Sequence, residues 1–575
     1  MAIPAPPPPG FIVPLRYDEI FGAPASREAL RALLSKVDWR GIVEVASMVS
    51  SVSWQDGIET PRHQIPFFRN LEPHLIYGAA LAMRLLTEPH RPVVTRESLL
   101  AVLRVAITLS VEVETDQRTF SDTFVKAALM ANELLQGEVT APEHHGAAED
   151  LLPSELRSAV LHFENLHDLL GRTDALFLWS RTERARASPH YLPIEADLQR
   201  FSGLTWPEYA ASGYLCLARC TSISHPAFAG RLSALFYLDQ WLAGLAESAK
   251  VRQWFNVSSV AVAQLRVDWS EAESLSFAAS GALWRKPVVR ADRGGFFVPH
   301  APLVQNTIGD GMFFLLLDGY RSDSPDGAVR RRFTQFYGDF FQDYIAERLT
   351  SGYAGRADVV VRTEGPYFVG RNRVMSTDVI VFESDDNVLF VEVMAKRPKL
   401  IESVVALSDE AIEEDSNVFI SKARELSNRI HDFREGLLFP DMPRPPGQRI
   451  YPIIVTPTTW PRIHLLHTIL PRAIAREDLL LGTEPIEILD AGDVELLEAG
   501  LQNGIRLSQL LLRKNGRGQI TDGRYKSVRD YLSLYEPGLL GNVRRPIRLR
   551  GDDVAHGILE LAHSWWGVGP PVFPL

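Results

Sequence analysis

The sequence predicts an α+β protein of several domains, with a mostly helical N-terminal half followed by an α/β domain whose mixed sheet is flanked by helices. Three observations predict this. The 575 residues exceed what one hydrophobic core holds. Apolar residues recur at three- and four-residue spacing through 26–282, and short apolar runs alternate with helical segments after residue 330. The expected parts are a Pro-rich lead-in (1–25), a helical domain (26–282), a hairpin-and-helix connector (283–329), an α/β domain (330–500) and a basic C-terminal segment (501–575).

The composition is that of a folded protein, with 46% hydrophobic and 23% charged residues. The opening MAIPAPPPPGF lacks the basic start and apolar stretch of a signal peptide, and no uninterrupted apolar run is long enough to span a membrane. We therefore expect a cytoplasmic protein with no membrane contact. Cys216 and Cys220, four residues apart, could form a redox pair or half a metal site, but two small buried residues in a reducing cytosol are favoured.

The helical domain is predicted from amphipathic runs, and the loop 141–155 separates two groups of them. His144 and His145 in that loop are adjacent and converge poorly on one ion, so we expect them to be solvated rather than to bind a metal. The runs that show the helical period most clearly are 26–37, 96–113, 118–135 and 225–249.

The connector begins with two β-rich runs around Asp-Arg-Gly-Gly within 283–302, which predicts a hairpin. An apolar helix over 304–320 is expected to follow. The α/β domain then contains, in order, a helix at 331–351, strands at 357–362, 366–370, 376–383 and 388–396, a helix at 416–437, a strand at 449–457 and a strand leading into an Asp-led helix at 485–500.

Two acidic residues lie at the strands predicted to be most buried. Asp378 begins one strand, and Glu392 interrupts the apolar run VLFVEV of the next. The turn at 384–387 folds these strands against each other, so both carboxylates can approach one point, where they would repel each other. A divalent cation relieves that repulsion, and Mg²⁺ favours oxygen ligands. Such an ion polarises a phosphoryl group and lowers the pKa of bound water, which suits phosphodiester hydrolysis.

A lysine follows on the same predicted strand. Because side chains alternate, Glu392, Met394 and Lys396 are expected on one face, with Lys396 about 7 Å from Glu392 along the chain. Its flexible stem could bring the ammonium group to the ion and its water, where it would orient the nucleophile or stabilise developing charge.

Asp378 and the run Glu392-Val-Met-Ala-Lys396, within a helix–three strands–helix–strand order, resemble the PD-(D/E)XK nuclease superfamily over residues 330–500. The resemblance implies a restriction-endonuclease-like fold with a mixed sheet flanked by helices. It also implies Asp378 and Glu392 as catalytic residues and as ligands of Mg²⁺, with Mn²⁺ as the alternative ion. Lys396 is the third predicted catalytic residue.

Two positions depart from the family pattern. The lysine that usually follows the second acid by two residues falls on Met394, and the glutamate of the first helix corresponds to Gln342. Lys396 could replace the missing lysine, and so could Lys422 on the following helix. Lysine migration of this kind is known in the superfamily.

The segment 513–550 has ten basic residues against three acids, although the whole chain has a net charge of −11. A local patch must therefore make any nucleic-acid contact. This segment is either a phosphate-backbone surface or a solvated basic face. The candidate nucleic-acid contacts are Lys422, Arg513, Lys514, Arg544 and Arg545.

Simpler interpretations exist for the acids. Asp378 could lie at an exposed sheet edge, and Glu392 could form an ion pair with Arg373 or Arg424. The sequence has no Walker loop, no Gly-x-Ser-x-Gly elbow and no zinc-ligand spacing.

Three functions follow from these observations. The first is a metal-dependent endonuclease, with DNA expected before RNA, acting as a restriction or phage-defence effector. Its helical half would contact a protein partner or gate the nuclease. The second is an inactive nuclease-like scaffold that binds nucleic acid or protein. The third is a helical interaction protein whose second half merely resembles a nuclease.

Overall fold

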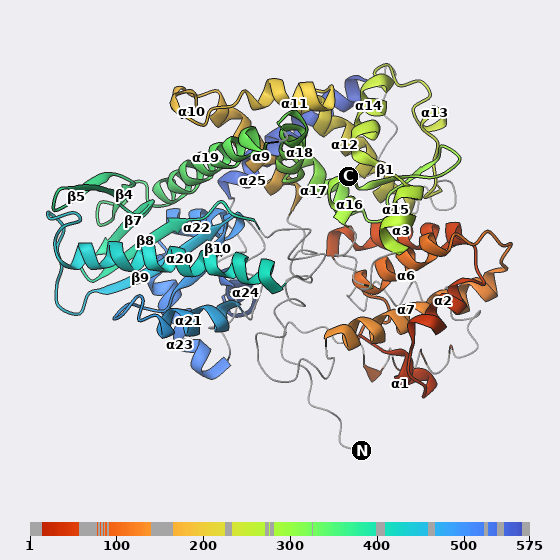
Figure 1. Cartoon of the computed structure of the whole chain (residues 1–575), viewed down its shortest axis with the longest axis horizontal. Helices are drawn as coiled ribbons and strands as arrows, with labels where there is room; N and C mark the ends of the chain where they lie inside the picture. Colours follow the sequence, from red (N-terminus) through yellow and green to blue (C-terminus); the bar gives the residue numbers. More distant parts are fainter. Residues whose placement is uncertain are drawn as a thin grey trace. The chain divides into compact units, whose positions relative to one another are not determined.

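The computed structural model describes residues 14–56, 91–139, 165–224, 233–270, 281–324, 326–397, 409–457, 466–521, 527–536 and 545–565, with single residues at 275 and between 78 and 88. It divides the chain into two compact units. Met1–His145, Glu195–Leu315 and His556–Leu575 form the helical unit. Gly146–Ile194 and Leu316–Ala555 form the α/β unit, which contains the larger sheet (Figure 1). The predicted α+β class, with helices first and a mixed sheet in the second half, is confirmed.

Three of the four runs with a clear helical period form helices in the helical unit. The predicted helices at 26–37, 96–113 and 118–135 correspond to α2 (Arg27–Leu34), α6 (Arg96–Leu109) and α7 (Gln117–Val139). The remaining helices with all or most of their residues in this unit are α1 (Tyr17–Phe21), α3 (Trp39–Asp56), α11 (Ile194–Ser202), α12 (Trp206–Thr221), α13 (Leu238–Trp241), α14 (Ser248–Ser258), α15 (Val262–Ser270), α16 (Gly281–Arg285) and α17 (Ala301–Ile308), with a 3₁₀ turn at Ser222–Ser224.

The predicted hairpin is present, but two helix predictions near it are wrong. Strands β2 (Val288–Arg290) and β3 (Phe296–Phe297) pair antiparallel, and β1 (Ser259–Ala261) joins β2 in parallel. The run 225–249 is not one helix, because the backbone of Phe236 exchanges hydrogen bonds of 2.9 and 2.7 Å with Phe296. The run 304–320 is split at Gly309 between α17 and α18 (Gly311–Asp323).

The α/β unit is built on a five-stranded sheet of order β10-β9-β8-β7-β4. The central strand β8 pairs antiparallel with β7 and parallel with β9, which makes the sheet mixed. Central strands covered on both faces contain long apolar runs, as β8 does over 388–391 and β9 over 450–455. The strands are β4 (Val360–Thr363), β7 (Val379–Ser384), β8 (Asn387–Val393), β9 (Arg449–Thr456) and β10 (Glu487–Asp490), and β5 (Pro366–Val369) and β6 (Asn372–Met375) form a separate hairpin.

Helices cover both faces of this sheet. On one face, the rings of Phe382 and Phe390 contact Phe433 of α20 (Asp409–Arg434). On the other face, the Glu383 carboxylate accepts hydrogen bonds from Tyr353, at the end of α19 (Ala328–Gly352), and from the first N–H groups of α23 (Leu507–Thr521). The unit also contains α9 (Leu166–Ser180), α10 (Glu183–Ala187), α21 (Leu466–Arg476), α22 (Ala491–Gln502), α24 (Val528–Tyr535) and the part of α25 (Pro546–Ser564) up to Ala555.

The division of the chain differs from the expected domain boundaries at several places, and the connector 283–329 is split after Leu315. Residues 146–194 group with the α/β unit rather than with the helices around them in sequence. Residues 501–555 also group with that unit instead of forming a separate segment. Both additions are held by ion pairs between residues far apart in the chain, as between Arg172 of α9 and Glu495 of α22. In the part of the chain that the structure describes, no helix combines the length and apolar character needed to cross a bilayer.

Candidate functional site

Three acidic residues lie opposite one another on three neighbouring segments of the sheet. Thr363 pairs with Val379, and Val379 pairs with Val391. Extending each antiparallel register by one residue places Glu364 and Glu392 on either side of Asp378. Directly opposite residues of antiparallel strands point to the same face. The convergence of Asp378 and Glu392 predicted from the four-residue turn is therefore present in the structure.

Asp378 is held by hydrogen bonds to both of its oxygens. Oδ2 accepts a bond of 2.6 Å from the backbone N–H of Val393. Oδ1 accepts one of 2.6 Å from the Gln342 amide, which also donates to Glu364 Oε2 at 2.8 Å. Burial, and then the neighbouring charge of Glu392, raise the pKa of Asp378 to about 8. Without a cation, Asp378 therefore carries a proton at neutral pH.

Glu392 is 8% exposed and pairs with a lysine from the next helix. The Lys422 ammonium, on α20, donates to Glu392 Oε1 at 2.9 Å and to Glu425 Oε2 at 2.8 Å. Burial raises the pKa of Glu392, although Lys422 opposes that shift. Burial lowers the pKa of Lys422, but the two carboxylates raise it by more than burial lowers it. The pKa therefore lies above its ordinary value, and the group stays charged.

The donor chemistry of this site fits a hard divalent cation. Among the described residues, no three His, Cys, Asp or Glu side chains are arranged to hold a metal ion. Mg²⁺ usually needs fewer protein ligands, because it keeps several waters and binds through one or two carboxylates plus a substrate phosphate. Asp378 and Glu392 supply two such carboxylates, and their raised pKa values show that existing partners do not fully compensate their charges.

The structure places the two lysines differently from the prediction. Strand β8 ends at Val393, so Lys396 lies three residues beyond it, and side-chain alternation does not extend to Lys396. The strand stops after the N–H of Met394 donates to the carbonyl of Val455 at 2.8 Å, and the Met394 side chain is buried. Lys422, predicted both as a nucleic-acid contact and as a possible replacement for the family lysine, lies in the carboxylate site.

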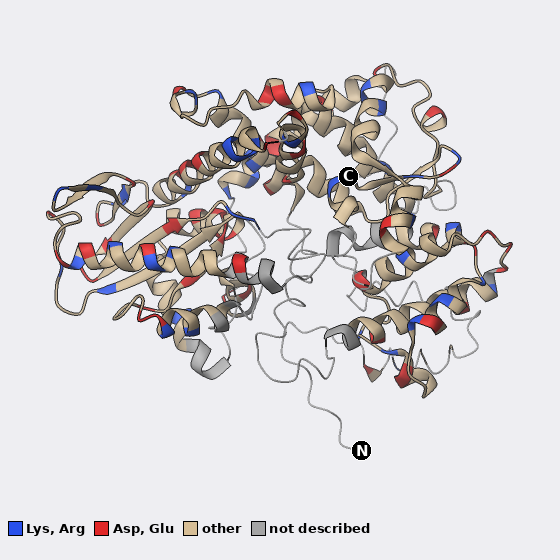
Figure 2. Cartoon of the chain, in the orientation of Figure 1, with Lys and Arg blue, Asp and Glu red and all other residues tan. Residues whose placement is uncertain are grey.

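Where the structure describes the basic C-terminal segment, several of its basic residues form ion pairs with acids. The prediction that Lys514 contacts phosphate is wrong, because Lys514 is 1% exposed and donates to both carboxylate oxygens of Glu487, at 2.9 and 3.0 Å. Arg513 makes two bonds of 3.0 Å to Glu536. Figure 2 accordingly shows basic and acidic residues interspersed along the helices of this unit. Of the other two candidates, Arg545 pairs with Asp168 at 2.9 Å, and Arg544 lies outside the described residues.

The two cysteines of the helical unit do not form a site. Cys216 and Cys220 are both buried on α12 and form no disulfide. Burial raises the pKa of the Cys216 thiol, so it is a poor nucleophile. This agrees with the interpretation of two small buried residues. The adjacent His144 and His145 lie outside the described residues.

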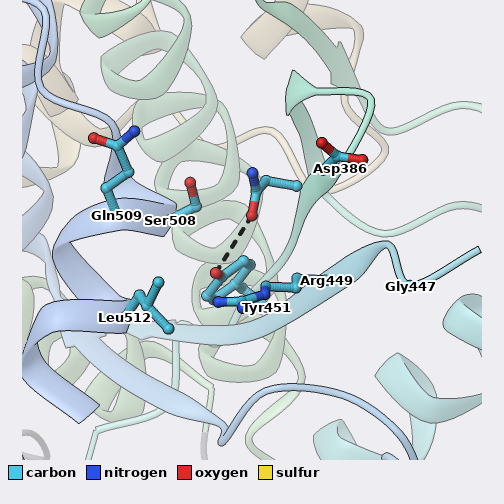
Figure 3. A pocket seen from close by; sticks show the side chains of 8 residues that line it. Asp386, Gly447, Arg449, Tyr451, Ser508, Gln509 and Leu512 are labelled. Atoms are coloured by element: carbon cyan, nitrogen blue, oxygen red, sulfur yellow. Dashed lines mark hydrogen bonds between the residues drawn. The ribbon is translucent and has the colours of Figure 1, made fainter. Parts of the chain in front are cut away.

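A pocket of about 440 Å³ lies at the other end of β8 (Figure 3). Glu392 is near the end of this strand, whereas Asn387 at its start lines the pocket, where its side-chain oxygen is 3.4 Å from the Tyr451 hydroxyl. None of the residues that line the pocket belongs to the carboxylate site. They are Asp386, Asn387, Gly447, Arg449, Tyr451, Ser508, Gln509 and Leu512.

Comparisons of the chain with protein-family models, curated proteins and solved structures found no match. The function is therefore inferred from the chemistry of the site itself.

Two residues of the site were not predicted from the sequence. Glu364 follows β4 directly, and its position opposite Asp378 depends on the register between β4 and β7. Because the β5–β6 hairpin separates these two strands in the sequence, their pairing could not be predicted from a short turn. Glu425 is one turn after Lys422 on α20, and this i, i+3 spacing was the available signal. Among the described residues, the ion-pair partner of Glu392 is Lys422 rather than Arg373 or Arg424, and Arg424 bonds Glu477 instead.

Proposed function

We propose that the α/β unit is a metal-dependent nuclease of the PD-(D/E)XK type that hydrolyses phosphodiester bonds of DNA or RNA. The observation that carries this proposal is the meeting of Asp378 and Glu392 on adjacent strands, buried, with a lysine 2.9 Å from the second carboxylate. Buried carboxylates with strongly shifted pKa values are costly to maintain and occur preferentially at functional sites.

The order of elements supports the fold part of the proposal. The chain passes from α19 through β4, β7 and β8 as an antiparallel meander, interrupted by the β5–β6 hairpin, and then through α20 into the parallel strand β9. This is the helix–three strands–helix–strand order that the family resemblance implies. The setting of restriction or phage defence rests on analogy with other chains that join a helical unit to a nuclease.

The side chains of the site have separable roles. Asp378 and Glu392 would hold Mg²⁺ or Mn²⁺, which supplies Lewis-acid polarisation of the phosphate when bound. The Val393 N–H and the Gln342 amide orient the Asp378 carboxylate. The Lys422 ammonium, kept charged by its two carboxylates, would stabilise the charge that develops on the phosphate oxygens.

The position of the lysines leads to the first prediction. We expect Lys422→Met to lower the cleavage rate by about 10²-fold or more, the usual cost of removing one group that stabilises transition-state charge. Lys396→Met should lower it by much less, because Lys396 lies beyond the strand. Single-turnover cleavage rates of both variants measure this. A larger loss for Lys396→Met would assign the catalytic lysine to Lys396.

The proposed function is tested by incubating the full chain with plasmid, single-stranded DNA and RNA in the presence of Mg²⁺ or Mn²⁺. Cleavage should require the ion and should be lost in Asp378→Ala and Glu392→Ala. Cleavage that persists in both variants would reject the site.

A nuclease-like scaffold without catalysis is the second candidate. It is favoured by the buried Met394 at the position of the family lysine, and by the protein groups that already bond Asp378 and Glu392. Such a scaffold would bind nucleic acid equally well with and without Mg²⁺ and would cleave none of the three substrates.

A further inference from the structure

The β5–β6 hairpin presents an exposed aromatic ring beside unpaired arginines. Phe368 is 64% exposed, the largest exposed fraction among the large hydrophobic residues described. Arg373 is its direct cross-strand partner, so the two exposed side chains lie on the same face. The two-residue turn Gly370-Arg371 joins the strands, with Gly370 at φ +61°. Arg371 and Arg373 form no ion pair with any described residue.

The hairpin is anchored on its opposite face. Tyr367, the residue before Phe368, is 8% exposed, and its hydroxyl donates to Asp432 of α20. Arg429 of α20 lies 3.3 Å from that hydroxyl and 5.9 Å from the centre of the ring. Because side chains alternate, fixing Tyr367 against α20 directs Phe368 to solvent. The exposed ring therefore stands on a rigid support.

The base of the hairpin is bonded directly to the carboxylate site. The N–H of Glu364 donates to the carbonyl of Asp378 at 2.8 Å, and the N–H of Ser376 donates to the carbonyl of Gly365 at 2.9 Å. Phe368 is four residues from Glu364, or ~13 Å along an extended chain. That length matches about four nucleotide rises of a stacked strand. In Figure 1 the hairpin projects beyond β4 and β7 at the edge of the α/β unit.

We infer that the β5–β6 hairpin is a base-stacking contact for single-stranded nucleic acid, with Phe368 stacking on a base and Arg371 and Arg373 contacting phosphates a few nucleotides from the carboxylate site. This inference rests on the proposed function, because it places the contact relative to the scissile bond. An aromatic ring flanked by cations matches an unpaired base and its backbone, and stacking tolerates any sequence because every base has a π-face. A protein partner would leave the two arginines without complementary charge unless its surface were acidic.

The test measures binding without cleavage. Fluorescence anisotropy of a labelled single-stranded oligonucleotide and its duplex is recorded with the full chain, with Ca²⁺ in place of Mg²⁺. Phe368→Ala should weaken single-strand binding by about ten-fold, the size of one lost stack. Phe368→Trp should restore it. Arg371→Gln with Arg373→Gln should weaken binding and reduce its salt dependence. Leu481→Ala is the matched control, since Leu481 is 63% exposed in the same unit.

Three results would overturn the inference: wild-type affinity in Phe368→Ala, an equal loss in Leu481→Ala, or tighter binding of the duplex than of the single strand. The outcome is separable from that of the nuclease proposal. Cleavage that depends on Asp378 but is unchanged in Phe368→Ala would remove only the hairpin inference. Binding that depends on Phe368 in a protein that never cleaves would support the hairpin contact and reject the nuclease.

Discussion

Asp378→Asn and Glu392→Gln are each expected to reduce Mg²⁺-dependent cleavage by about 10³-fold or more, because each removes a negative oxygen ligand while keeping the size of the side chain. The Asn oxygen can still accept the Val393 N–H, so the local backbone bond is retained. Single-turnover cleavage of plasmid and single-stranded DNA measures the loss.

Asp385→Asn is the matched control for these variants. Asp385 is an exposed acid in the turn between the same two strands and makes no contact with the site. The Asp385→Asn variant should cleave at the wild-type rate. Similar losses in all three variants would mean that net charge, rather than a carboxylate pair, governs activity. Unchanged thermal unfolding of the variants would show that lost cleavage does not reflect lost folding.

Arg172→Met is expected to destabilise the α/β unit by about 3–5 kcal/mol, the typical cost of leaving a buried charge without its partner. Arg172 of α9 bonds both oxygens of Glu495 at 2.8 and 2.9 Å, and these side chains are 4% and 0% exposed. Tyr344 of α19 donates to the same carboxylate at 2.7 Å. Differential scanning calorimetry should show a lower unfolding temperature, by ~2–4 °C for each kcal/mol.

Two further variants make this stability prediction specific. Arg172→Met combined with Glu495→Leu removes both charges and should recover much of the loss, since a buried pair can be replaced by apolar residues at little cost. Arg184→Met should change stability by less than about 1 kcal/mol, because Arg184 pairs with Asp343 while 78% exposed. Equal effects of Arg172→Met and Arg184→Met would contradict the assignment of α9 to the core of the α/β unit.

The sequence predicts the order of the sheet elements well, because each strand is a short apolar run that can be recognised without knowing its partners. The apolar runs of β7, β8 and β9 are continuous, and the short turn predicts that β7 and β8 pair antiparallel. The exact register is not set by the turn alone, because it shifts by one residue between Phe382 and Ser384, and the shifted register brings Asp378 opposite Glu392. The strand end was harder to predict, since Met394 is apolar and buried although it lies outside β8.

Contacts between distant segments could not be predicted in this way. Lys422 reaches Glu392 only because of how α20 is rotated against the sheet, and the 28 residues between Val393 and Lys422 leave that rotation open. The same holds for Lys514, whose partner Glu487 lies on another element. A charge count over 513–550 includes only the acids within that segment. It therefore misses Glu487, and Lys514 was predicted to lie on a basic surface although it forms a buried ion pair.

The central claim, that Asp378 and Glu392 bind one divalent cation together, is tested most directly by calorimetric titration of Mn²⁺ into the full chain at several pH values. The ion requires an ionised Asp378, whose pKa of about 8 means that the metal-free site holds a proton at neutral pH. Affinity should therefore rise with pH up to about 8, with about one proton released per ion at pH 7. Asp378→Asn and Glu392→Gln should each abolish this uptake, and Asp385→Asn should keep it. No uptake by the wild type with nucleic acid present, or equal uptake by all four proteins, would contradict the claim.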